Sequence, residues 1–371
     1  MPCGWMRMTT LYFRFRRQTS RMQCMNTPSP APSSLQPPRR SAWSRLCRIC
    51  ALGWLLAAWA LQQGVSAAPS EPSAPGAAQT FGPLISAQAL ATQPTQVRII
   101  DLRDDAAAAN VAHIPGALPA PYADWRGPSN NPGQLLPLPR FTALVRRLGL
   151  NAETPVVLVA TGDDPSDFGA PARVYWTLKW LGLKHLAILN GGMTAWQAAA
   201  LPLTRQPTPA PTPSAFTPQL DDALLATRSE VARDLGHPRT LLLDARPKAF
   251  YLGREKAPAA SRPGTLPGAL DFDNLRWFEP GSGALPAVST LQRIAAQLPQ
   301  QPGAVQTVSF CNTGHWAATN SFVLSEVLHR PHVALYPGSM VDWSRADAPM
   351  AHVPTRWQQL RQQLEQTWQA L

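Results

Sequence analysis

The stretch TVSFCNTGHWAATNSFVLSEVL, Thr307–Leu328, places a cysteine between two segments of different periodicity. An apolar, β-branched run leads to Cys311, a short polar turn that holds Gly314 follows, and a helical pattern begins at Ala317. In open α/β sheets, sites gather where strands end and helices begin. The other four cysteines of the chain all lie within its first fifty residues, so the position of Cys311 needs its own explanation.

The first 67 residues have the composition of an export leader. They contain nine arginines and no acidic residue, and the apolar run Ile49–Leu61 is followed by small residues. A membrane anchor is the alternative, but a span needs about 20 apolar residues. We expect residues 1–67 to hold a secretory signal peptide cleaved after Ala67, and the mature protein to be periplasmic or secreted without a membrane span. The long basic region leaves open a translation start at Met25.

The formal charge of +11 belongs to this leader. Without its nine arginines, 24 basic and 22 acidic residues remain, a net charge of +2. A nucleic-acid-binding body would instead show a clustered excess of Lys and Arg. The composition therefore excludes nucleic acid as a partner of the mature protein.

Cleavage after Ala67 would leave one cysteine. Cys47 and Cys50 form a C-x-x-C pair, but both lie in the leader and are interpreted as chance. Cys311 then has no partner for an internal disulfide. In an oxidising compartment such a thiol is either used or buried, and a buried small hydrophobic role is the alternative to a reactive one.

Two Pro-rich segments divide the chain. Residues 68–80 are predicted to be a flexible spacer, and residues 205–218 an interdomain linker. The predicted domains are therefore residues 81–204 and residues 219–371, the second ending in a C-terminal helix.

The two parts repeat each other in four motifs that follow the same order. The pairs are VRIIDLRDD with TLLLDARPK (from Val97 and Thr240), HIPGAL with TLPGAL (from His113 and Thr265), PVVLVATGDD with VQTVSFCNTG (from Pro155 and Val305), and AILNGGMTAW with ALYPGSMVDW (ending at Trp196 and Trp343). Short apolar runs alternate with amphipathic stretches in each part, which predicts an α/β fold with a mostly parallel sheet flanked by helices in each domain. Trp196 and Trp343 are expected to pack on the sheets.

Together these motifs resemble the rhodanese family, specifically its tandem-domain sulfurtransferases, over Ala87 to Ala348. The resemblance implies a rhodanese fold in each half, an inactive first domain, and a cysteine of the second domain that carries a persulfide. It implies thiosulfate or 3-mercaptopyruvate as a small anionic sulfur donor and a thiol or cyanide as the acceptor.

The chemistry expected of the Cys311 loop is nucleophilic attack on sulfur. A thiolate is required, and backbone N–H groups together with the start of a helix can favour it. The residues expected to form the cradle for the persulfide are Asn312, Thr313, Gly314, His315, Trp316 and Ala317. His315 could assist or could be a surface residue. The expected two-step reaction needs no metal and no organic cofactor.

The loop departs from the family at two positions. Trp316 stands where the family often has arginine, and Phe250 stands where some members have a substrate-binding arginine. The nearest substrate-binding candidates in sequence are Arg246, Arg254, Lys256 and Arg262. A structural pairing of Arg246 with a carboxylate is the favoured alternative, as for Arg103 in the first half.

In the first half, Asp163 and Asp164 are expected where a nucleophile would stand, so this domain is predicted to be silent and to form one wall of the cleft. Two loops after the P-G-A motifs, which begin at Tyr122 and Asn274, could reach that cleft. A phosphatase would need arginine at the position of Ala317. A sulfur carrier or a ligand-binding module on the same fold remains the alternative to an enzyme. HRPH, His329–His332, lacks companion metal ligands.

Overall fold

The computed structural model describes residues 81–106, 108, 110–355, 357–358 and 361. The predicted leader (1–67), the spacer (68–80) and most of the predicted C-terminal helix lie outside these residues. Within the described ranges no helix is both long enough and apolar enough to cross a membrane.

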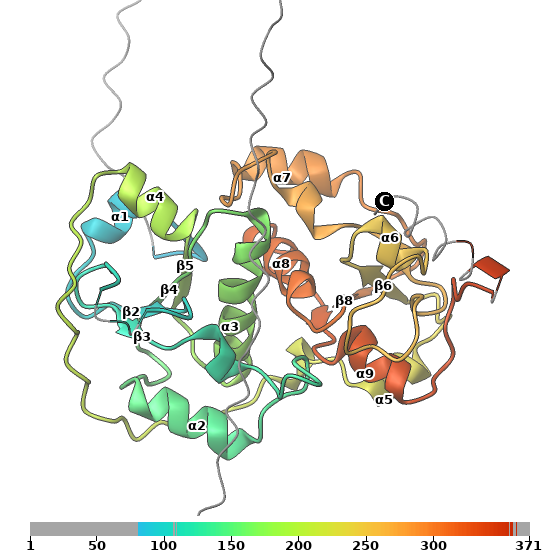
Figure 1. Ribbon diagram of the computed structural model, residues 1–371, viewed down its shortest axis with the longest axis horizontal. Coiled ribbons are helices and arrows are strands. Elements are labelled where there is room, and N and C mark those ends of the chain that lie inside the picture. Colours follow the sequence, from blue (N-terminus) through green and yellow to red (C-terminus); the bar gives the residue numbers. More distant parts are fainter. Residues whose placement is uncertain (1–80, 107, 109, 356, 359–360, 362–371) are drawn as a thin grey trace, which may run out of the picture. The chain divides into compact units, whose positions relative to one another are not determined.

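The first domain is a parallel sheet with helices around it (Figure 1). The strand order is β1-β5-β4-β2-β3, and every pairing is parallel. The elements are β1 (Leu84–Ile85), α1 (Ala87–Ala91), β2 (Arg98–Asp101), β3 (Leu118–Pro119), η1 (Tyr122–Trp125), α2 (Leu138–Arg147), β4 (Val156–Val159), η2 (Pro165–Phe168), α3 (Gly169–Trp180), β5 (Leu186–Leu189) and α4 (Gly192–Ala198).

The second domain repeats this topology. Its strand order is β7-β6-β8-β9, again parallel, and a bridge from Leu225 to Leu335 takes the place of β1. The elements are η3 (Asp222–Leu224), α5 (Arg228–Arg233), β6 (Thr240–Asp244), α6 (Lys248–Tyr251), β7 (Leu270–Asp271), η4 (Asn274–Trp277), α7 (Val288–Ala295), β8 (Gln306–Phe310), α8 (Trp316–Phe322), the π-helical turn η5 (Val323–Val327), β9 (Val333–Leu335) and α9 (Ser339–Arg345). The predicted α/β class with parallel sheets is confirmed.

Burial explains why these segments adopt these structures. All residues of β4, β5 and β6 are buried, as expected for strands covered on both faces by helices. In α2, Phe141, Leu144 and Val145 are buried at the spacing of one helical face, while basic residues occupy the last turn. The apolar face of α2 that the sequence periodicity predicts is therefore the face that packs on the core.

The repeated Asp-x-Arg motif forms the same ion pair in both domains. Arg103 donates to the carboxylate of Asp101 from its backbone N–H, Nε and Nη2, and Nη2 also donates to a backbone carbonyl. Arg246 does the same to Asp244, with an Nη2 to Oδ2 distance of 2.6 Å, and also donates to the carbonyl of Gly264. The predicted structural pairing of Arg246 is confirmed.

Trp196 and Trp343 are also equivalent and both are buried, as predicted. Each indole N–H donates to the carbonyl of the residue six positions later, at 2.9 Å for Trp196 and 2.8 Å for Trp343. These bonds tie the chain after the last helix of each domain back onto the sheet.

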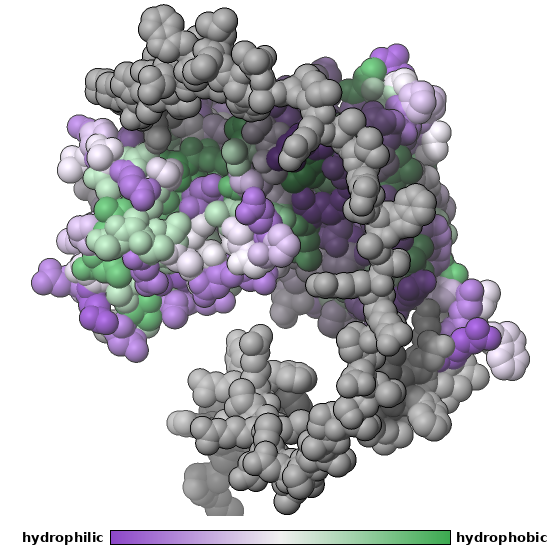
Figure 2. Space-filling view, turned by 90° about the horizontal axis from the view of Figure 1, so that it is seen from above, coloured by the Kyte–Doolittle hydropathy of each residue, from purple (hydrophilic) through white to green (hydrophobic). Residues whose placement is uncertain are grey.

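Helices α3 and α8 join the two domains, and Figure 1 shows them side by side between the sheets. Glu326, just after α8, accepts from Lys179 at 2.7 Å and from the hydroxyl of Tyr175 at 3.0 Å. Phe168 and Tyr175 pack edge-on against Phe322. A single hydrophobic cluster therefore runs from the first sheet to the second. On the face seen in Figure 2, the described surface mixes hydrophilic and hydrophobic residues.

The ion pair of Arg246 with Asp244 is buried more deeply than that of Arg103 with Asp101, so breaking it should cost more folding stability. The Arg246 side chain is 2% exposed and that of Arg103 is 12% exposed. Asp244→Ala should lower the free energy of unfolding by about 3–5 kcal/mol, because it leaves a buried guanidinium without its carboxylate. Urea unfolding of the full chain measures this loss. Asp101→Ala is the matched control and should cost less; equal losses would contradict the argument.

Candidate functional site

Cys311 is the first residue after β8, and its backbone is held by the first two residues of α9. Its N–H donates to the hydroxyl of Ser339 at 3.0 Å, and this hydroxyl donates to the carbonyl of Tyr336 at 2.8 Å. The carbonyl of Cys311 accepts from the N–H of Met340 at 3.0 Å. Both the N–H and the carbonyl of Cys311 are therefore hydrogen-bonded, which fixes the end of β8.

Ser339 is a site residue that sequence analysis missed. It has a positive φ of 51°, as its first-domain counterpart Gly192 has (54°). Non-glycine residues seldom adopt this conformation. The serine hydroxyl that bonds to Cys311 N–H gives a reason for accepting this strain. The signal was present in the paired motifs NGGM and PGSM, where the second half has a serine at the position of the second glycine of the first half.

The first-domain counterpart of Cys311 is Ala160. Val159 pairs with Asp101 as Phe310 pairs with Asp244, and the carbonyl of Ala160 accepts from Met193 as that of Cys311 accepts from Met340. The expectation that Asp163 and Asp164 occupy the position of the nucleophile is therefore wrong. Asp164 instead caps η2 through the N–H of Ser166. The first domain has a methyl group where the second has a thiol.

The loop after Cys311 presents free backbone donors. None of the N–H groups from Asn312 to Ala317 donates a hydrogen bond to a residue that the structure describes. Gly314, with φ of 71°, allows the tight turn. Successive unpaired N–H groups in a turn are suited to binding an anion.

Cys311 is 1% exposed and lines a cavity of about 580 Å³ between the two domains. The second domain contributes Ala257, Cys311, Asn312, Thr313, His315 and Trp316, and the first contributes Asp104, Tyr122, Ala123, Arg126, Gly127, Ser129, Pro132 and Ser166. The thiol is thus buried against the core and still borders a cavity large enough for a small molecule.

The loop that begins at Tyr122 forms the first-domain wall of this cavity. Gly133, in that loop, lies so close to the second domain that a Cβ would approach the carbonyl of Gly338 and the Cα of Thr313 to about 3 Å. The matching loop of the second domain packs on the first in the same way: the N–H of Leu285 donates to Asn190 at 2.8 Å. The first-domain loop therefore reaches the cavity at Cys311, and the second-domain loop packs on the equivalent region of the first domain.

A hydrogen-bonded chain crosses the interface at His315. Its Nε2 lies 2.9 Å from the carbonyl of Ser166 and must donate to it, so Nδ1 accepts from the hydroxyl of Tyr122 at 3.0 Å. Arg126 donates to the same hydroxyl. Burial, followed by the charge of Arg126, lowers the pKa of His315 to about 4. The imidazole is therefore neutral at physiological pH.

The two positions that depart from the family contact one another. The rings of Phe250 and Trp316 meet edge to face with centroids 6.0 Å apart. The indole N–H of Trp316 donates to the hydroxyl of Ser166 in the first domain at 2.9 Å. An aromatic pair thus occupies these two positions, and Trp316 lines the cavity.

None of the four predicted substrate-binding cations lines this cavity. Arg246 is used by Asp244, Arg262 pairs with Asp347, and Arg254 and Lys256 are exposed.

Two arginines of the first domain lie against the loop instead. Arg126 Nη2 donates to the carbonyl of Thr313 at 3.1 Å, and the guanidinium of Arg173 lies against Gly314. The predicted cations flank Phe250 in the sequence, whereas Arg126 and Arg173 belong to the other domain.

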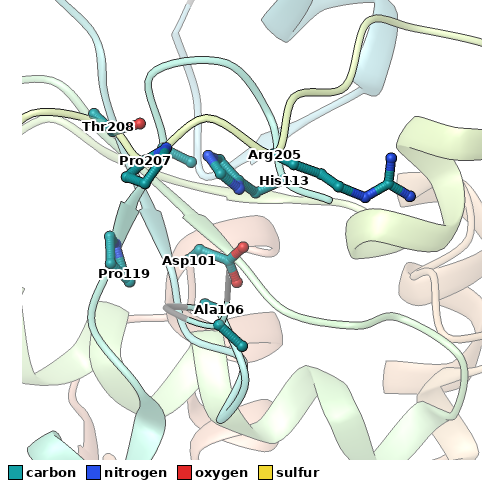
Figure 3. A pocket seen from close by; sticks show the side chains of 9 residues that line it. Asp101, Ala106, His113, Pro119, Arg205, Pro207 and Thr208 are labelled. Carbon is teal, nitrogen blue, oxygen red and sulfur yellow. The ribbon is translucent and has the colours of Figure 1, made fainter. Parts of the chain in front are cut away.

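A smaller cavity of about 80 Å³ in the first domain is lined by Asp101, His113 and Arg205, among others (Figure 3). The carboxylate of Asp101 is already bound by Arg103 through two side-chain nitrogens. The residues that line this smaller cavity include no cysteine, whereas the cavity at Cys311 is larger and includes a thiol, so it is the better candidate site.

Comparison with known proteins agrees with this geometry. The model of the Rhodanese-like domain matches residues 86–199 and 227–346. A probable 3-mercaptopyruvate sulfurtransferase of Pseudomonas aeruginosa is 35% identical over 245 residues, covering 62% of this chain and 81% of that protein. The thiosulfate sulfurtransferase of Rattus norvegicus is 28% identical over 249 residues, covering 65% and 80%.

Solved structures show the same fold. The 3-mercaptopyruvate sulfotransferase of Escherichia coli superposes with a TM-score of 0.57 at 24% identity, over 70% of this chain and 98% of that one. An anaerobic ergothioneine biosynthesis enzyme of Chlorobium limicola superposes with a TM-score of 0.63 at 17% identity, over 74% and 71%. From the two matched domains and the shared topology, the chain belongs to the rhodanese family as a tandem-domain sulfurtransferase.

Proposed function

We propose that this protein transfers a sulfane sulfur from a small anionic donor to a thiol or cyanide through a persulfide on Cys311. The observation that supports this most is the position of the thiol: Cys311 borders the interdomain cavity at the start of a turn whose six N–H groups, Asn312 to Ala317, have no partner among the described residues. Such donors suit the negative charge of a persulfide better than any neutral ligand.

The first half-reaction loads the cysteine. With thiosulfate, the Cys311 thiolate attacks the outer sulfur, a new S–S bond forms, and sulfite leaves with the electron pair of the broken bond. With 3-mercaptopyruvate, the carbon–sulfur bond breaks, the electron pair stays on carbon, and a proton from solvent completes pyruvate. Both routes leave an anionic persulfide.

The second half-reaction unloads it. A thiolate or cyanide attacks the outer sulfur, the S–S bond of the persulfide breaks, and Cys311 recovers its thiolate. The scheme is ping-pong, because the donor product leaves before the acceptor enters. No electrons beyond those of the donor and acceptor are required, and we propose no metal and no cofactor.

The cavity suits a donor that combines charge with a small apolar part. Arg126 borders one side, and Trp316, backed by Phe250, forms an aromatic side. The named relatives act on thiosulfate or 3-mercaptopyruvate, and the relative with the higher identity is of the mercaptopyruvate type. We therefore place 3-mercaptopyruvate first and thiosulfate second.

His315 positions the site and does not transfer protons in this proposal. Both ring nitrogens are used, one by Tyr122 and one by Ser166, and the neutral ring joins the Cys311 loop to the first domain. Its place beside Gly169 is tight, since a Cβ there would lie 2.6 Å from Nε2.

Loading of Cys311 can be measured by mass. The full chain incubated with either donor should gain 32 Da, the approximate mass of one sulfur atom, and peptide mapping should place it on the peptide that holds Cys311. The gain should disappear with a reductant. Cys311→Ser, the matched control, should show no gain on that peptide, because a hydroxyl does not hold the sulfur.

The outcomes separate the alternatives. Repeated turnover with cyanide or a dithiol supports an enzyme, whereas one stoichiometric transfer supports the sulfur carrier. No adduct on Cys311 with any donor would contradict the proposal and favour a ligand-binding module on this fold.

The low pKa of His315 predicts a pH effect on stability. In the unfolded chain the imidazole binds a proton near pH 6.5, but in the folded protein only near pH 4, so the folded state loses stability as the pH falls between these values. At pH 5 the loss should be on the order of 1–2 kcal/mol. Urea midpoints at pH 7.5 and 5.0 should fall more for the wild type than for His315→Gln. An equal fall would show that His315 is protonated in the fold.

We also propose that the protein is exported, on the basis of the leader composition alone. N-terminal sequencing of the secreted or periplasmic protein should begin at Ala68; a protein retained with its leader would contradict this.

A further inference from the structure

Arg173 is a buried cation without a partner. It lies on α3, its side chain is 1% exposed, and neither Nε nor Nη1 makes a hydrogen bond within the described part of the chain. Its guanidinium carbon lies 5.0 Å from the ring centroid of Trp176. An aromatic face contributes on the order of 1–2 kcal/mol to a cation, which is less than the cost of burying an unpaired charge. The position therefore calls for an anion.

The guanidinium of Arg173 lies against the Cys311 loop. A Cβ built on Gly314 would collide with its Nη1, so glycine is needed there to make room as well as for its positive φ. Arg126 donates to the carbonyl of the preceding residue, Thr313. Two guanidinium groups of the first domain thus contact two consecutive residues of the loop.

The groups around Arg173 leave few candidates for the missing anion. The charges that act on it are those of Arg126, which repels it, and the ionised forms of Tyr122 and Cys311, which attract it; no carboxylate of the described residues belongs to this set. Burial, with the repulsion of Arg126, lowers the pKa of Arg173 to about 9. Burial raises the pKa of Tyr122, which keeps the phenol neutral at physiological pH. Of these groups, the Cys311 thiol is the one that can supply the negative charge.

We infer that Arg173, from the catalytically silent domain, supplies the positive charge that holds Cys311 as a thiolate and then as a persulfide anion. It is a positioning residue: it takes up no proton and forms no bond to the substrate. The thiol proton leaves to solvent, and the charge pair forms where the guanidinium was unpaired. The persulfide part of this inference rests on the proposed function.

The inference gives the first domain a chemical reason to be present. Trp316 and Phe250 occupy positions where the family often has arginine, and the second domain contributes no cation to the cavity lining. From the first domain, Arg126 lines the cavity and Arg173 on α3 lies against the Cys311 loop at Gly314. The same helix carries Lys179, which pairs with Glu326 and provides a matched charge at the interface outside the cavity lining.

The test is the pH dependence of alkylation of Cys311. The full chain reacts with iodoacetamide, and the rate is followed on the peptide that holds Cys311, so that the cysteines of residues 1–67 do not interfere. Removing the charge in Arg173→Met should move the alkylation profile to higher pH by about one unit or more, because the thiolate loses a nearby opposite charge. Lys179→Met, which removes another charge of the same helix, should leave the profile unchanged.

If Arg173 has only a structural role, the wild type and Arg173→Met should give identical alkylation profiles. That result would overturn the inference. If Arg173→Met does not fold, the pH dependence of stability in the wild type and in Cys311→Ser tests the inference instead. A charge pair between Arg173 and Cys311 stabilises the fold only where the thiol is ionised, so its contribution grows as the pH rises. The difference in Tm between the wild type and Cys311→Ser should therefore grow from pH 6 to pH 9, and a constant difference would overturn the inference.

The two proposals can fail separately, because alkylation uses no sulfur donor. A shifted profile without a persulfide adduct would support the charge pair and contradict sulfur transfer. An adduct with an unchanged profile would support sulfur transfer and remove Arg173 from it.

Discussion

The contact between α3 of the first domain and the Cys311 loop of the second is the interaction on which the site depends. It brings the guanidinium of Arg173 against Gly314 and that of Arg126 to the carbonyl of Thr313. Without it, the second domain would keep its strand, its turn and its thiol, but not the wall of the cavity or these charges. Since α3 and α8 share one hydrophobic cluster, the site is held by the burial that joins the domains.

Duplication accounts for this arrangement. The loops that begin at Tyr122 and Asn274 each extend from one domain onto the other, so each domain covers its neighbour's strand ends. One of the two equivalent positions holds a thiol, Cys311, and the other holds Ala160. The first domain, which lacks a thiol at this position, forms one wall of the cavity at Cys311.

One residue with a strained backbone, Ser339, lies beside the thiol. Ser339 keeps a backbone conformation that its counterpart Gly192 adopts without cost, and its hydroxyl bonds to the N–H of Cys311. His315 is kept neutral by burial and links the loop to Tyr122 and Ser166. Both devices fix the loop in position and leave its own N–H groups free for the negative charge that sulfur brings.

The sequence by itself determined the parallel α/β class, the duplication, the Asp-x-Arg pairs and the place of Cys311, because each depends on local periodicity or on residues two to six positions apart. Only the tertiary structure decided which cations lie against the Cys311 loop. Arg254, one of the candidates predicted around Phe250, is exposed, while Arg126 and Arg173 approach the loop from the other domain. The structure also showed that the counterpart of the cysteine is Ala160 and not Asp163. Motif spacing alone does not give this position, because the register of hydrogen bonds depends on how the strands pair.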